Sequence, residues 1–472
     1  MTNSKNSIYI KSGLWYTVGN ILIKGISFLA LPIFTRILSP DDFGKYNVFL
    51  SYENILQVII GLGLSGTIKV AYFDYKGEFN KYFSSIVSFT FFTTLIFDLL
   101  ANLFILLFVG TNLPSFWTVE LVNILVFSSL SNALYALIST RYVIEAKYKA
   151  NLAMSFTYTI LSVLFSVLLC LTLFSTQRYL GRIIGQVLPL VVMTMSISIV
   201  YVTKYRSIIN WSHWVYALKL GLPLILHMLS MVLLMQIGKL VIDNYLGSAI
   251  TGIYSVAVTI AGILTVLLVS FDNAWAPWFY RGLAGEEGIN LVNGNNKISI
   301  LFAFVTSVFI LISPEIVRIM SSKEYHDAIY SLVPLIIAVF INFMYLFAVN
   351  QEYFYKKTKT IAIGTVVATI CCTGIDFLFI PVFGYLTAAY ADMIGKGVLY
   401  LIHTLVVRKM NKEDVVSNRL LLILLLALCI VGGGTLLLKD LLLIRLALVL
   451  MLTIFIAKPI RQYIVEFKQQ IK

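Results

Sequence analysis

Charged residues are scarce in this sequence. Only 12% of its 472 residues are Asp, Glu, Lys or Arg, whereas 59% are hydrophobic. A soluble domain averages about 25% charged and about 45–50% apolar residues. So little charge cannot coat the water-facing surface of a chain this long, which excludes a soluble enzyme, and so high an apolar share excludes a disordered chain. The composition therefore predicts a membrane protein with many spans.

Cysteine and histidine are also sparse. There are four of each; the cysteines lie inside apolar runs without ligand-like spacing, and the histidines are scattered along the chain. These patterns exclude a disulfide scaffold, and we expect neither a metal nor a cofactor. The positions are Cys170, Cys371, Cys372, Cys429, His213, His227, His326 and His403.

Long apolar runs fill most of the chain. A helix that crosses a bilayer needs about 20 mostly apolar residues, and the sequence contains fourteen such runs. The predicted fold class is therefore an all-α polytopic membrane protein with about 14 transmembrane helices. The runs are Ser12–Leu38, Tyr46–Tyr72, Ser84–Gly110, Thr118–Ile144, Leu152–Phe174, Arg182–Val202, Tyr216–Asp243, Thr251–Tyr280, Ile298–Met320, Ile329–Phe354, Thr360–Phe383, Thr387–Val407, Leu420–Leu438 and Leu441–Ile460.

Basic residues indicate the orientation of these spans. With the amino terminus placed inside, the inside loops and termini carry 23 Lys and Arg, the outside loops carry 8, and four lysines lie within spans. Cytoplasmic loops are enriched in Lys and Arg, so we expect both termini in the cytoplasm. The net charge of +13 is then mostly a topological signal, and no nucleic-acid partner is expected.

An internal repeat relates the two halves of the chain. A shift of 208 residues aligns Lys11–Tyr72 with Lys219–Tyr280, and both copies contain the spacing L-x5-G-x-Y-x-V, from Leu38 and from Leu246. Both copies begin on the predicted cytoplasmic side, which indicates a parallel repeat of two pseudo-symmetric six-helix lobes. We expect an N-terminal lobe at 1–203, an interfacial linker at 204–215, a C-terminal lobe at 216–410, and a C-terminal helix pair with a cytoplasmic tail at 411–472.

The first span and the loop after it carry a family resemblance. The runs GLWYTVGN from Gly13 and LPIFTRILSPDDFGKY from Leu31 resemble the opening of bacterial polysaccharide transporters, most closely Wzx-type flippases. These belong to the multidrug/oligosaccharidyl-lipid/polysaccharide exporter superfamily. The resemblance implies a multi-pass protein of the bacterial inner membrane. It also implies transport of undecaprenyl-diphosphate-linked oligosaccharide repeat units, for O-antigen, capsule or exopolysaccharide, to the outer leaflet by alternating access.

The same resemblance implies the partners. They are the lipid-linked oligosaccharide, membrane lipids, a coupling ion that is either H⁺ or Na⁺, and a polysaccharide polymerase with its chain-length regulator. Two members of the superfamily are alternatives: a lipid II-type flippase and a multidrug exporter. A membrane glycosyltransferase or polymerase is less well supported, because the predicted outside loops are too short for a catalytic segment. We therefore expect no enzymatic activity.

The segment between the first two predicted spans, within LPIFTRILSPDDFGKY, has a physical interpretation. Pro40 and the two aspartates after it suit a helix start, and Gly44 permits close packing or a special backbone angle. We interpret Arg36, Pro40, Gly44 and Tyr46 as a structural hinge between the first two spans rather than as ligand contacts.

Several cations lie within predicted spans, where an isolated charge costs about 2.5–3.5 kcal/mol. Lys24, Lys239 and Lys396 are candidates to line the cavity and bind an anionic diphosphate headgroup. The alternatives are ion pairs: Lys24 with Glu53 or Asp98 from another helix, and two pairs one turn apart on the same helix, Lys239 with Asp243 and Lys396 with Asp392.

Carboxylates also lie within the spans. Glu53, Asp98, Asp272 and Asp376 are candidates for ion coupling, because a carboxylate in a low-dielectric site can bind and release a proton or a sodium ion. Each of them is as well explained by a satisfied polar contact between helices.

Overall fold

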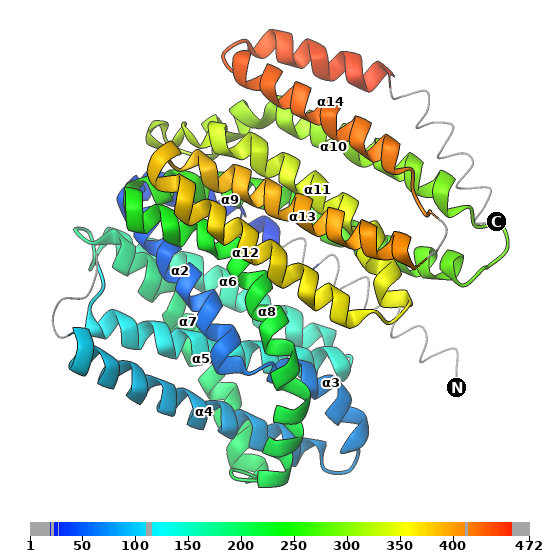
Figure 1. The fold of residues 1–472 in the computed structure, drawn as a ribbon. Helices are drawn as coiled ribbons and strands as arrows, with labels where there is room; N and C mark the ends of the chain where they lie inside the picture. Colours follow the sequence, from blue (N-terminus) through cyan, green and yellow to red (C-terminus); the bar gives the residue numbers. More distant parts are fainter. Residues whose placement is uncertain (1–18, 20–22, 27, 110–115, 411–413, 456–472) are drawn as a thin grey trace. The chain divides into compact units, whose positions relative to one another are not determined.

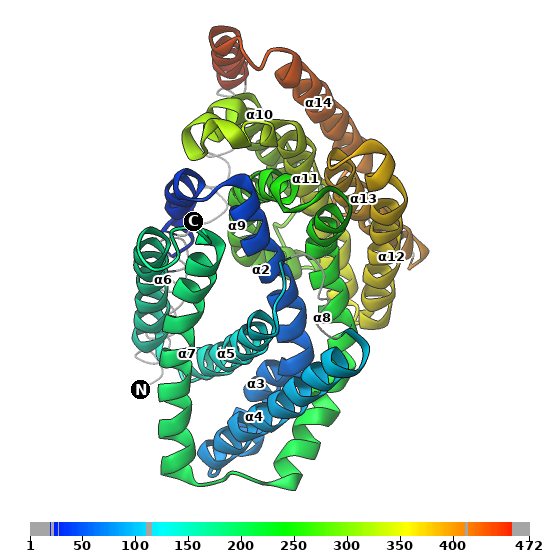
Figure 2. The ribbon, with the colours of Figure 1, turned by 90° about the vertical axis from the view of Figure 1, so that its left-hand side faces the viewer.

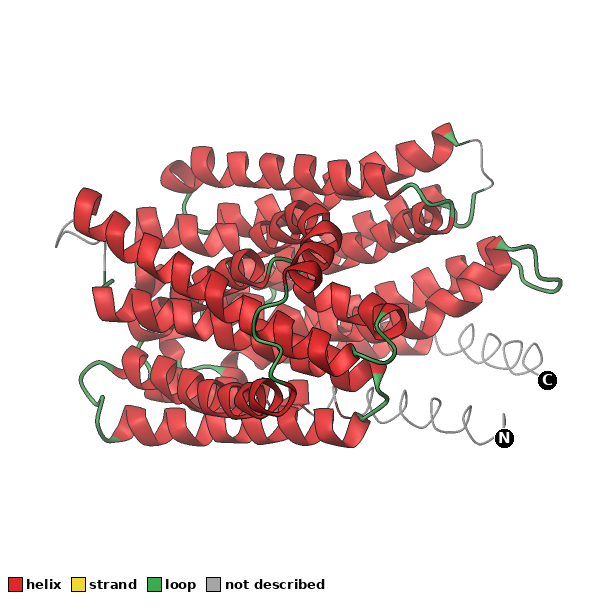
Figure 3. Ribbon diagram, turned by 90° about the horizontal axis from the view of Figure 1, so that it is seen from below, coloured by secondary structure: helices red, strands yellow, loops and turns green. Residues whose placement is uncertain are grey.

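The computed structural model describes residues 19, 23–26, 28–109, 116–410 and 414–455. Within these ranges the regular structure is helical throughout (Figure 3). Residues 28–37 are helical and lead to α2 (Figure 1). The elements that follow are α2 Pro40–Gly61, α3 Leu64–Asp74, α4 Phe79–Phe104, a π-helical turn Ile105–Val109, α5 Val119–Ile144, α6 Tyr148–Leu171, α7 Arg178–Tyr205, α8 Trp211–Leu246, α9 Ser248–Leu283, α10 Leu291–Met320, a 3₁₀ turn Lys323–Tyr325, α11 Ala328–Phe354, α12 Thr358–Phe383, α13 Leu386–Lys409 and α14 Asn418–Leu437.

Twelve candidate spans occur among the described residues, and they coincide with the second to the thirteenth predicted runs. The predicted fold class is thereby confirmed. The second span is made of two helices, since α2 and α3 together occupy Pro40–Asp74. The first and last predicted runs lie partly outside the described residues, and their described parts, 28–37 and Leu442–Phe455, are helical. Helices suit a bilayer because they satisfy every backbone hydrogen bond within one segment.

Two compact units make up the chain, Met1–Gln236 (unit 1) and Ile237–Lys472 (unit 2). In unit 1, α5 is central and contacts α2, α3, α4, α6 and α7. In unit 2, α11 is central and contacts α9, α10, α12, α13 and α14. Figure 2 shows α6 beside α7 and α12 beside α13, and these pairs are in contact. Each unit is thus a helix bundle built around one buried helix.

Helix positions repeat between the two units. After the shift of 208 residues found in the sequence, the starts of α2 and α7 coincide with those of α9 and α13, and the start of α5 falls one residue before that of α11. The contacts repeat as well: α5 packs on α2 and α7 as α11 packs on α9 and α13. The non-helical join between α7 and α8 is 206–210, a part of the predicted linker. The predicted lobe boundaries themselves stay a prediction.

A backbone-to-backbone contact lies where α2 gives way to α3. Leu62 and Gly63 both have positive φ, 44° and 67°. A Cβ at Gly63 would lie 2.7 Å from the carbonyl oxygen of Gly221 in α8, and a Cβ at Gly221 would lie 2.4 Å from that of Leu62. Both positions therefore require glycine. Gly63 has a positive φ and a backbone atom where its Cβ would lie, whereas Gly221 is restricted by the close backbone approach alone.

The helix Leu442–Phe455 is attached to α10 by one arginine. Arg445, only 1% exposed, places Nη1 and Nη2 each 2.5 Å from an oxygen of Glu315, a bidentate pair. It also donates to the backbone carbonyls of Leu311, Leu438 and Lys439 at 2.7–3.0 Å. This guanidinium therefore joins the last described helix, the turn before it and α10.

Replacing Arg445 by Ala should lower the free energy of unfolding by about 3–5 kcal/mol, because it removes the bidentate partner of Glu315 and leaves three carbonyls without their donor. Arg318→Ala is the control, since its pairs with Asp440 at 2.6 Å and with Glu315 at 3.7 Å involve a guanidinium that is 43% exposed, and exposed pairs contribute about 0–1 kcal/mol. Thermal unfolding of the purified chain in detergent measures both. Equal shifts for the two variants would contradict this account.

Candidate functional site

Glu53 is the buried acid of unit 1. It lies on α2, is 5% exposed, and accepts a hydrogen bond from the Ser128 hydroxyl on α5. The side chain of Asn132, one turn further along α5, is a second partner. Ser129 also donates to the Glu53 backbone carbonyl at 3.5 Å. The acid is thus held by side chains of the central helix, as a buried polar group requires.

Tyr46, two turns before Glu53 on α2, extends this polar region to α7. Its hydroxyl donates to the side-chain oxygen of Gln186. Arg182, one turn before Gln186, lies with its guanidinium carbon 4.6 Å from the ring centroid of Tyr46 and 3.8 Å from that of Phe34. Arg182 also donates to the hydroxyl of Ser166 on α6 at 2.8 Å. We call Tyr46, Glu53, Ser128, Arg182 and Gln186 the Tyr46 cluster.

Asp376 is the buried acid of unit 2. It lies on α12, is 1% exposed, and its Oδ1 has no hydrogen-bond partner within the described part of the chain. The thiol of Cys372 lies 3.9 Å from Oδ2. On α13, Lys396 and Asp392 form an ion pair with 2.7 Å between Nζ and Oδ2, and Asp392 lies close enough to act electrostatically on Asp376.

Helices α8 and α9 complete this region. A Cβ at Gly238 on α8 would lie 3.6 Å from Oδ2 of Asp376 and 3.7 Å from the hydroxyl of Tyr254 on α9. Lys239 follows Gly238 and is 9% exposed. Four helices thus converge on Asp376, and the glycine lets α8 come close. We call Tyr254, Asp376, Asp392 and Lys396 the Tyr254 cluster.

The two clusters occupy related places in their units. Tyr46 and Tyr254 are equivalent under the shift of 208 residues and lie near the starts of α2 and α9. The polar side chains of α7, Arg182 and Gln186, are matched on the equivalent α13 by Asp392 and Lys396. Each unit therefore has a tyrosine, a cation and a buried acid in its interior, although the acids come from different helices.

The predicted hinge element forms the start of α2. Ser39 is the N-cap and accepts from the backbone N–H of Asp42 at 3.1 Å, and Pro40 is the first helical residue. Arg178 donates to the Ile37 carbonyl at 2.6 Å, which ties this turn to α7. Arg36 bonds the Pro32 carbonyl of its own helix, and Gly44 is buried. Of the four predicted hinge residues, Tyr46 belongs to the cluster as well.

The remaining predicted residues lie apart from the clusters. Lys24 is exposed, and it forms no ion pair with Glu53 or Asp98 among the described residues. Asp98 is half-buried on α4 and its Oδ1 has no partner within the described ranges. Asp272 on α9 accepts from the Asn350 amide on α11 at 3.4 Å, and Asn350 accepts from Tyr280 at 2.6 Å.

Sequence reasoning missed several interior residues. Arg182 is the first residue of the predicted span Arg182–Val202, and the structure places it one turn inside α7, against Phe34 and Tyr46. Its position one turn before Gln186 was the available signal. Tyr254 was marked by the repeat alone. Glu352 and His403, both fully buried, are separated by 51 residues and carry no motif.

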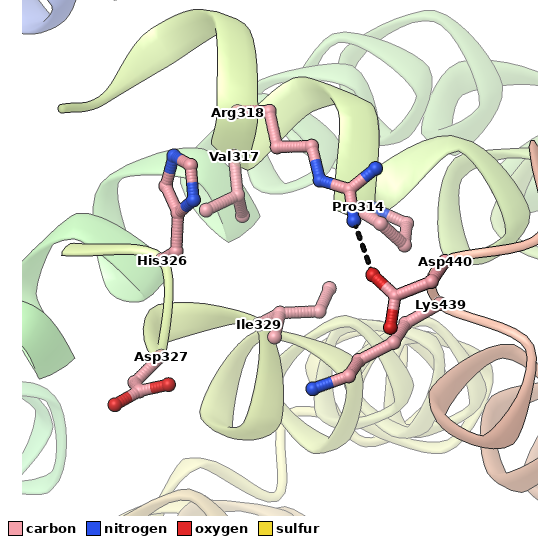
Figure 4. Close-up of a pocket in the computed structure, with 8 residues that line it drawn as sticks. All are labelled: Pro314, Val317, Arg318, His326, Asp327, Ile329, Lys439 and Asp440. Atoms are coloured by element: carbon pink, nitrogen blue, oxygen red, sulfur yellow. Dashed lines mark hydrogen bonds and ion pairs between the residues drawn. The ribbon is translucent and has the colours of Figure 1, made fainter. Parts of the chain in front are cut away.

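A pocket in unit 2 lies at the end of α10 and shares no residue with the Tyr254 cluster (Figure 4). Arg318 points to Asp440 across it, with 2.6 Å between Nη2 and Oδ1. Lys439 donates to the Tyr330 hydroxyl at 2.5 Å, and this hydrogen bond raises the pKa of Lys439. Three polar side chains of this pocket, Arg318, Lys439 and Asp440, are bonded to one another or to Tyr330 at helix ends, so we do not treat the pocket as the functional site. Its lining residues are Pro314, Val317, Arg318, His326, Asp327, Ile329, Lys439 and Asp440.

Comparison with protein families gives a match over residues 9–283, more than half of the chain, to the model described as "Polysaccharide biosynthesis protein". The chain belongs to this polysaccharide biosynthesis family. Two curated proteins of Haemophilus influenzae are similar to it. "Uncharacterized membrane protein" is 22% identical over 86% of the chain and 98% of its own length. "Lsg locus putative protein 1" is 22% identical over 85% and 98%.

Solved structures show the same fold as this family member. The lipid II flippase MurJ, in an inward closed conformation, has a TM-score of 0.69 and 18% identity, over 95% of this chain and 100% of that one. An inward-facing multidrug resistance MATE family transporter of the MOP superfamily has a TM-score of 0.61 and 14% identity, over 84% and 99%. The predicted all-α fold class and the resemblance to polysaccharide biosynthesis proteins are confirmed, and the protein is a multi-pass membrane protein.

Ser128→Ala tests whether Glu53 depends on its partner from α5. Losing this donor at a buried carboxyl should cost about 1–3 kcal/mol of stability. Ser131→Ala is the matched control, because Ser131 is buried on the same helix but donates only to the Phe127 carbonyl of that helix. The midpoints of thermal unfolding in detergent compare the two. If Ser131→Ala lowered the unfolding midpoint as much as Ser128→Ala, the loss of any buried hydroxyl would explain the effect, and the bond to Glu53 would not be its cause.

Proposed function

We propose that this protein is a flippase that moves undecaprenyl-diphosphate-linked oligosaccharide repeat units from the cytoplasmic to the outer leaflet of a bacterial inner membrane. Membership of the polysaccharide biosynthesis family carries the proposal. It is supported by the fold shared with MurJ and MATE transporters and by two helix bundles with repeated contacts, an arrangement suited to alternating access. Both termini lie in the cytoplasm in this proposal.

The proposed cargo follows from the basic side chains that lie in the interior of the two units. Lys239 and Lys396 are buried or half-buried within unit 2, and Arg182 is half-buried within unit 1. Charges in such surroundings attract a diphosphate far more strongly than they would in water. Lys24, exposed on the first described helix, is a further candidate. We propose that Lys24, Lys239 and Lys396 bind the anionic headgroup.

Coupling is assigned to the buried acids. Glu53 and Asp376 are the most buried of the four candidates, and each belongs to a cluster that contains a cation. An acid whose surroundings change between two conformations binds its ion more tightly in one of them, which links ion binding to the cycle. Asp98 and Asp272 are secondary candidates. The coupling ion is H⁺ or Na⁺.

Two related cargoes are the alternatives. A lipid II-type flippase would carry the same lipid diphosphate with a different sugar. A multidrug exporter of the same superfamily would favour cationic compounds, which the interior lysines disfavour. Transport by itself requires no enzymatic step, and a polymerase with its chain-length regulator would act on the flipped product.

Neutralising the interior pair of α13 tests the cargo. In proteoliposomes, Asp392→Asn combined with Lys396→Met should slow flipping of a fluorescent undecaprenyl-diphosphate oligosaccharide at least about tenfold, because a charge-assisted hydrogen bond contributes about 1.5–3 kcal/mol. The double change avoids leaving an unpaired buried charge. Lys24→Ala tests the exposed lysine in the same assay.

Lys439→Met is the control, since Lys439 lies at a helix end outside the candidate spans. Normal flipping by the double variant, at normal expression, would remove Lys396 from the cargo site. Transport of ethidium without transport of the lipid diphosphate would favour the multidrug alternative.

An uncoupler tests the coupling ion. We expect flipping by the wild-type protein to slow when the proton gradient is dissipated, and Glu53→Gln and Asp376→Asn to be slow with or without the gradient. Replacing external Na⁺ by choline tests coupling to Na⁺ separately. Flipping that is unchanged under both conditions would exclude coupling to either ion.

A further inference from the structure

The join between α7 and α8, residues 206–210, presents apolar side chains to its surroundings. Ile208 and Ile209 are 48% and 69% exposed, and Trp211, the first residue of α8, is 74% exposed. Arg206 ends α7 with a positive φ of 49°. Figure 2 shows the join crossing from α7 to α8 at the bottom of the view. Large apolar side chains that gather on one exposed stretch indicate a surface that another molecule covers.

The start of α8 is fixed on the rest of unit 1. The indole N–H of Trp214 donates to the backbone carbonyl of Ser85 on α4 at 3.1 Å. His213 is 3% exposed and packs between two tyrosines, with its ring centroid 5.0 Å from that of Tyr75 and 5.3 Å from that of Tyr82. These contacts hold the join in one place, and its exposed apolar side chains take no part in them.

Basic residues accompany the apolar side chains of the join. Lys204, in the last turn of α7, and Arg206 are both exposed, and neither forms an ion pair among the described residues. The sequence has no Asp or Glu between Glu145 and Asp243. The segment 204–211 therefore combines two positive charges with three exposed apolar side chains and contains no acid.

Acids of the adjoining helix ends are engaged with other groups. Asp74, at the end of α3, accepts a hydrogen bond from the Tyr216 hydroxyl at 2.5 Å. Glu78, just before α4, forms an ion pair with Lys81 at 2.7 Å. The positive charges of the join are thus available to an anionic partner from outside the protein.

The flanking helices place the join at the face of a membrane. Both α7 and α8 are candidate spans, of 28 and 36 residues. At 1.5 Å per residue they are about 42 Å and about 54 Å long, whereas the hydrocarbon core of a bilayer is about 30 Å thick. A join between two such helices reaches the headgroup region. Trp side chains concentrate there, and Lys and Arg meet lipid phosphates.

We propose that the segment 204–211 is a binding surface for anionic phospholipid. Ile208, Ile209 and Trp211 insert below the headgroups, and Lys204 and Arg206 contact the lipid phosphates. Apolar insertion by itself does not distinguish one lipid from another. The two cations provide the preference, because each basic residue near an anionic surface raises binding about fivefold. The inference does not depend on the proposed transport function.

Hydrogen–deuterium exchange of the full chain tests this surface in two kinds of nanodisc, one of phosphatidylglycerol and one of phosphatidylcholine with the same acyl chains. The amides of 207–210, which lie outside any helix, should exchange at least about fivefold more slowly in phosphatidylglycerol. An anionic surface also slows exchange by lowering the local hydroxide concentration, so the rates are corrected by those of 145–147, the join between α5 and α6. Both leaflets of a nanodisc have the same composition, so the side on which the join lies does not affect the result.

Lys204→Gln combined with Arg206→Gln should bring the rates in the two lipids to within about twofold of each other. Both side chains are exposed, so the packing of unit 1 should persist. Lys147→Gln combined with Lys149→Gln is the matched control. It removes two exposed cations next to the α5–α6 join and should leave the difference at 207–210 unchanged.

Ile209→Ser combined with Trp211→Ser tests the apolar part of the surface. Exchange at 207–210 should become faster in both lipids, because less of the join is inserted in the bilayer. Equal corrected rates in the two lipids for the wild type would overturn the proposal, as would an equal effect of the control variant. Rapid exchange in both lipids that the serine variant leaves unchanged would also overturn it, since the join would then lie in water.

Discussion

The cost of placing charge in hydrocarbon determines much of this structure. Within the described residues, several interior charges are bonded to groups of a neighbouring helix in their own unit. Glu53 is bonded from α5, and Arg445 attaches the last described helix to α10. Hydrophobic association between helices is weak in a bilayer, so polar contacts of this kind carry part of the packing specificity.

The repeat is better preserved in the backbone than in the side chains. Helix starts and helix contacts correspond after the shift of 208 residues, yet the interior groups differ. Where α7 presents Arg182 and Gln186, α13 presents Asp392 and Lys396. Helix packing depends mainly on small residues and shape, so it tolerates this divergence. The two units are therefore copies in construction and distinct in chemistry.

The sequence was sufficient for the spans, because hydropathy and the distribution of Lys and Arg are local signals. It also predicted the Lys396–Asp392 pair as one alternative, since those residues are one turn apart. It could not bring Asp376 to Tyr254, or Glu352 to His403, because such contacts join helices far apart in the chain. Arg182 was not predicted as an interior residue for another reason: a basic residue at the end of an apolar run is typical of a span boundary, although α7 begins one turn earlier.

The contact of Gly63 with Gly221 has a consequence for variation of the sequence. It involves no side chain, so no rotamer can move aside to accommodate a larger residue. Two positions 158 residues apart are thereby restricted together. The Gly221 carbonyl lies where a Cβ at position 63 would be, and the Leu62 carbonyl lies where a Cβ at position 221 would be, so a change at one position makes no room at the other. Compensating changes, common where side chains interdigitate, are not available here. Natural drift at this crossing is limited by the backbone itself rather than by hydrophobicity or charge.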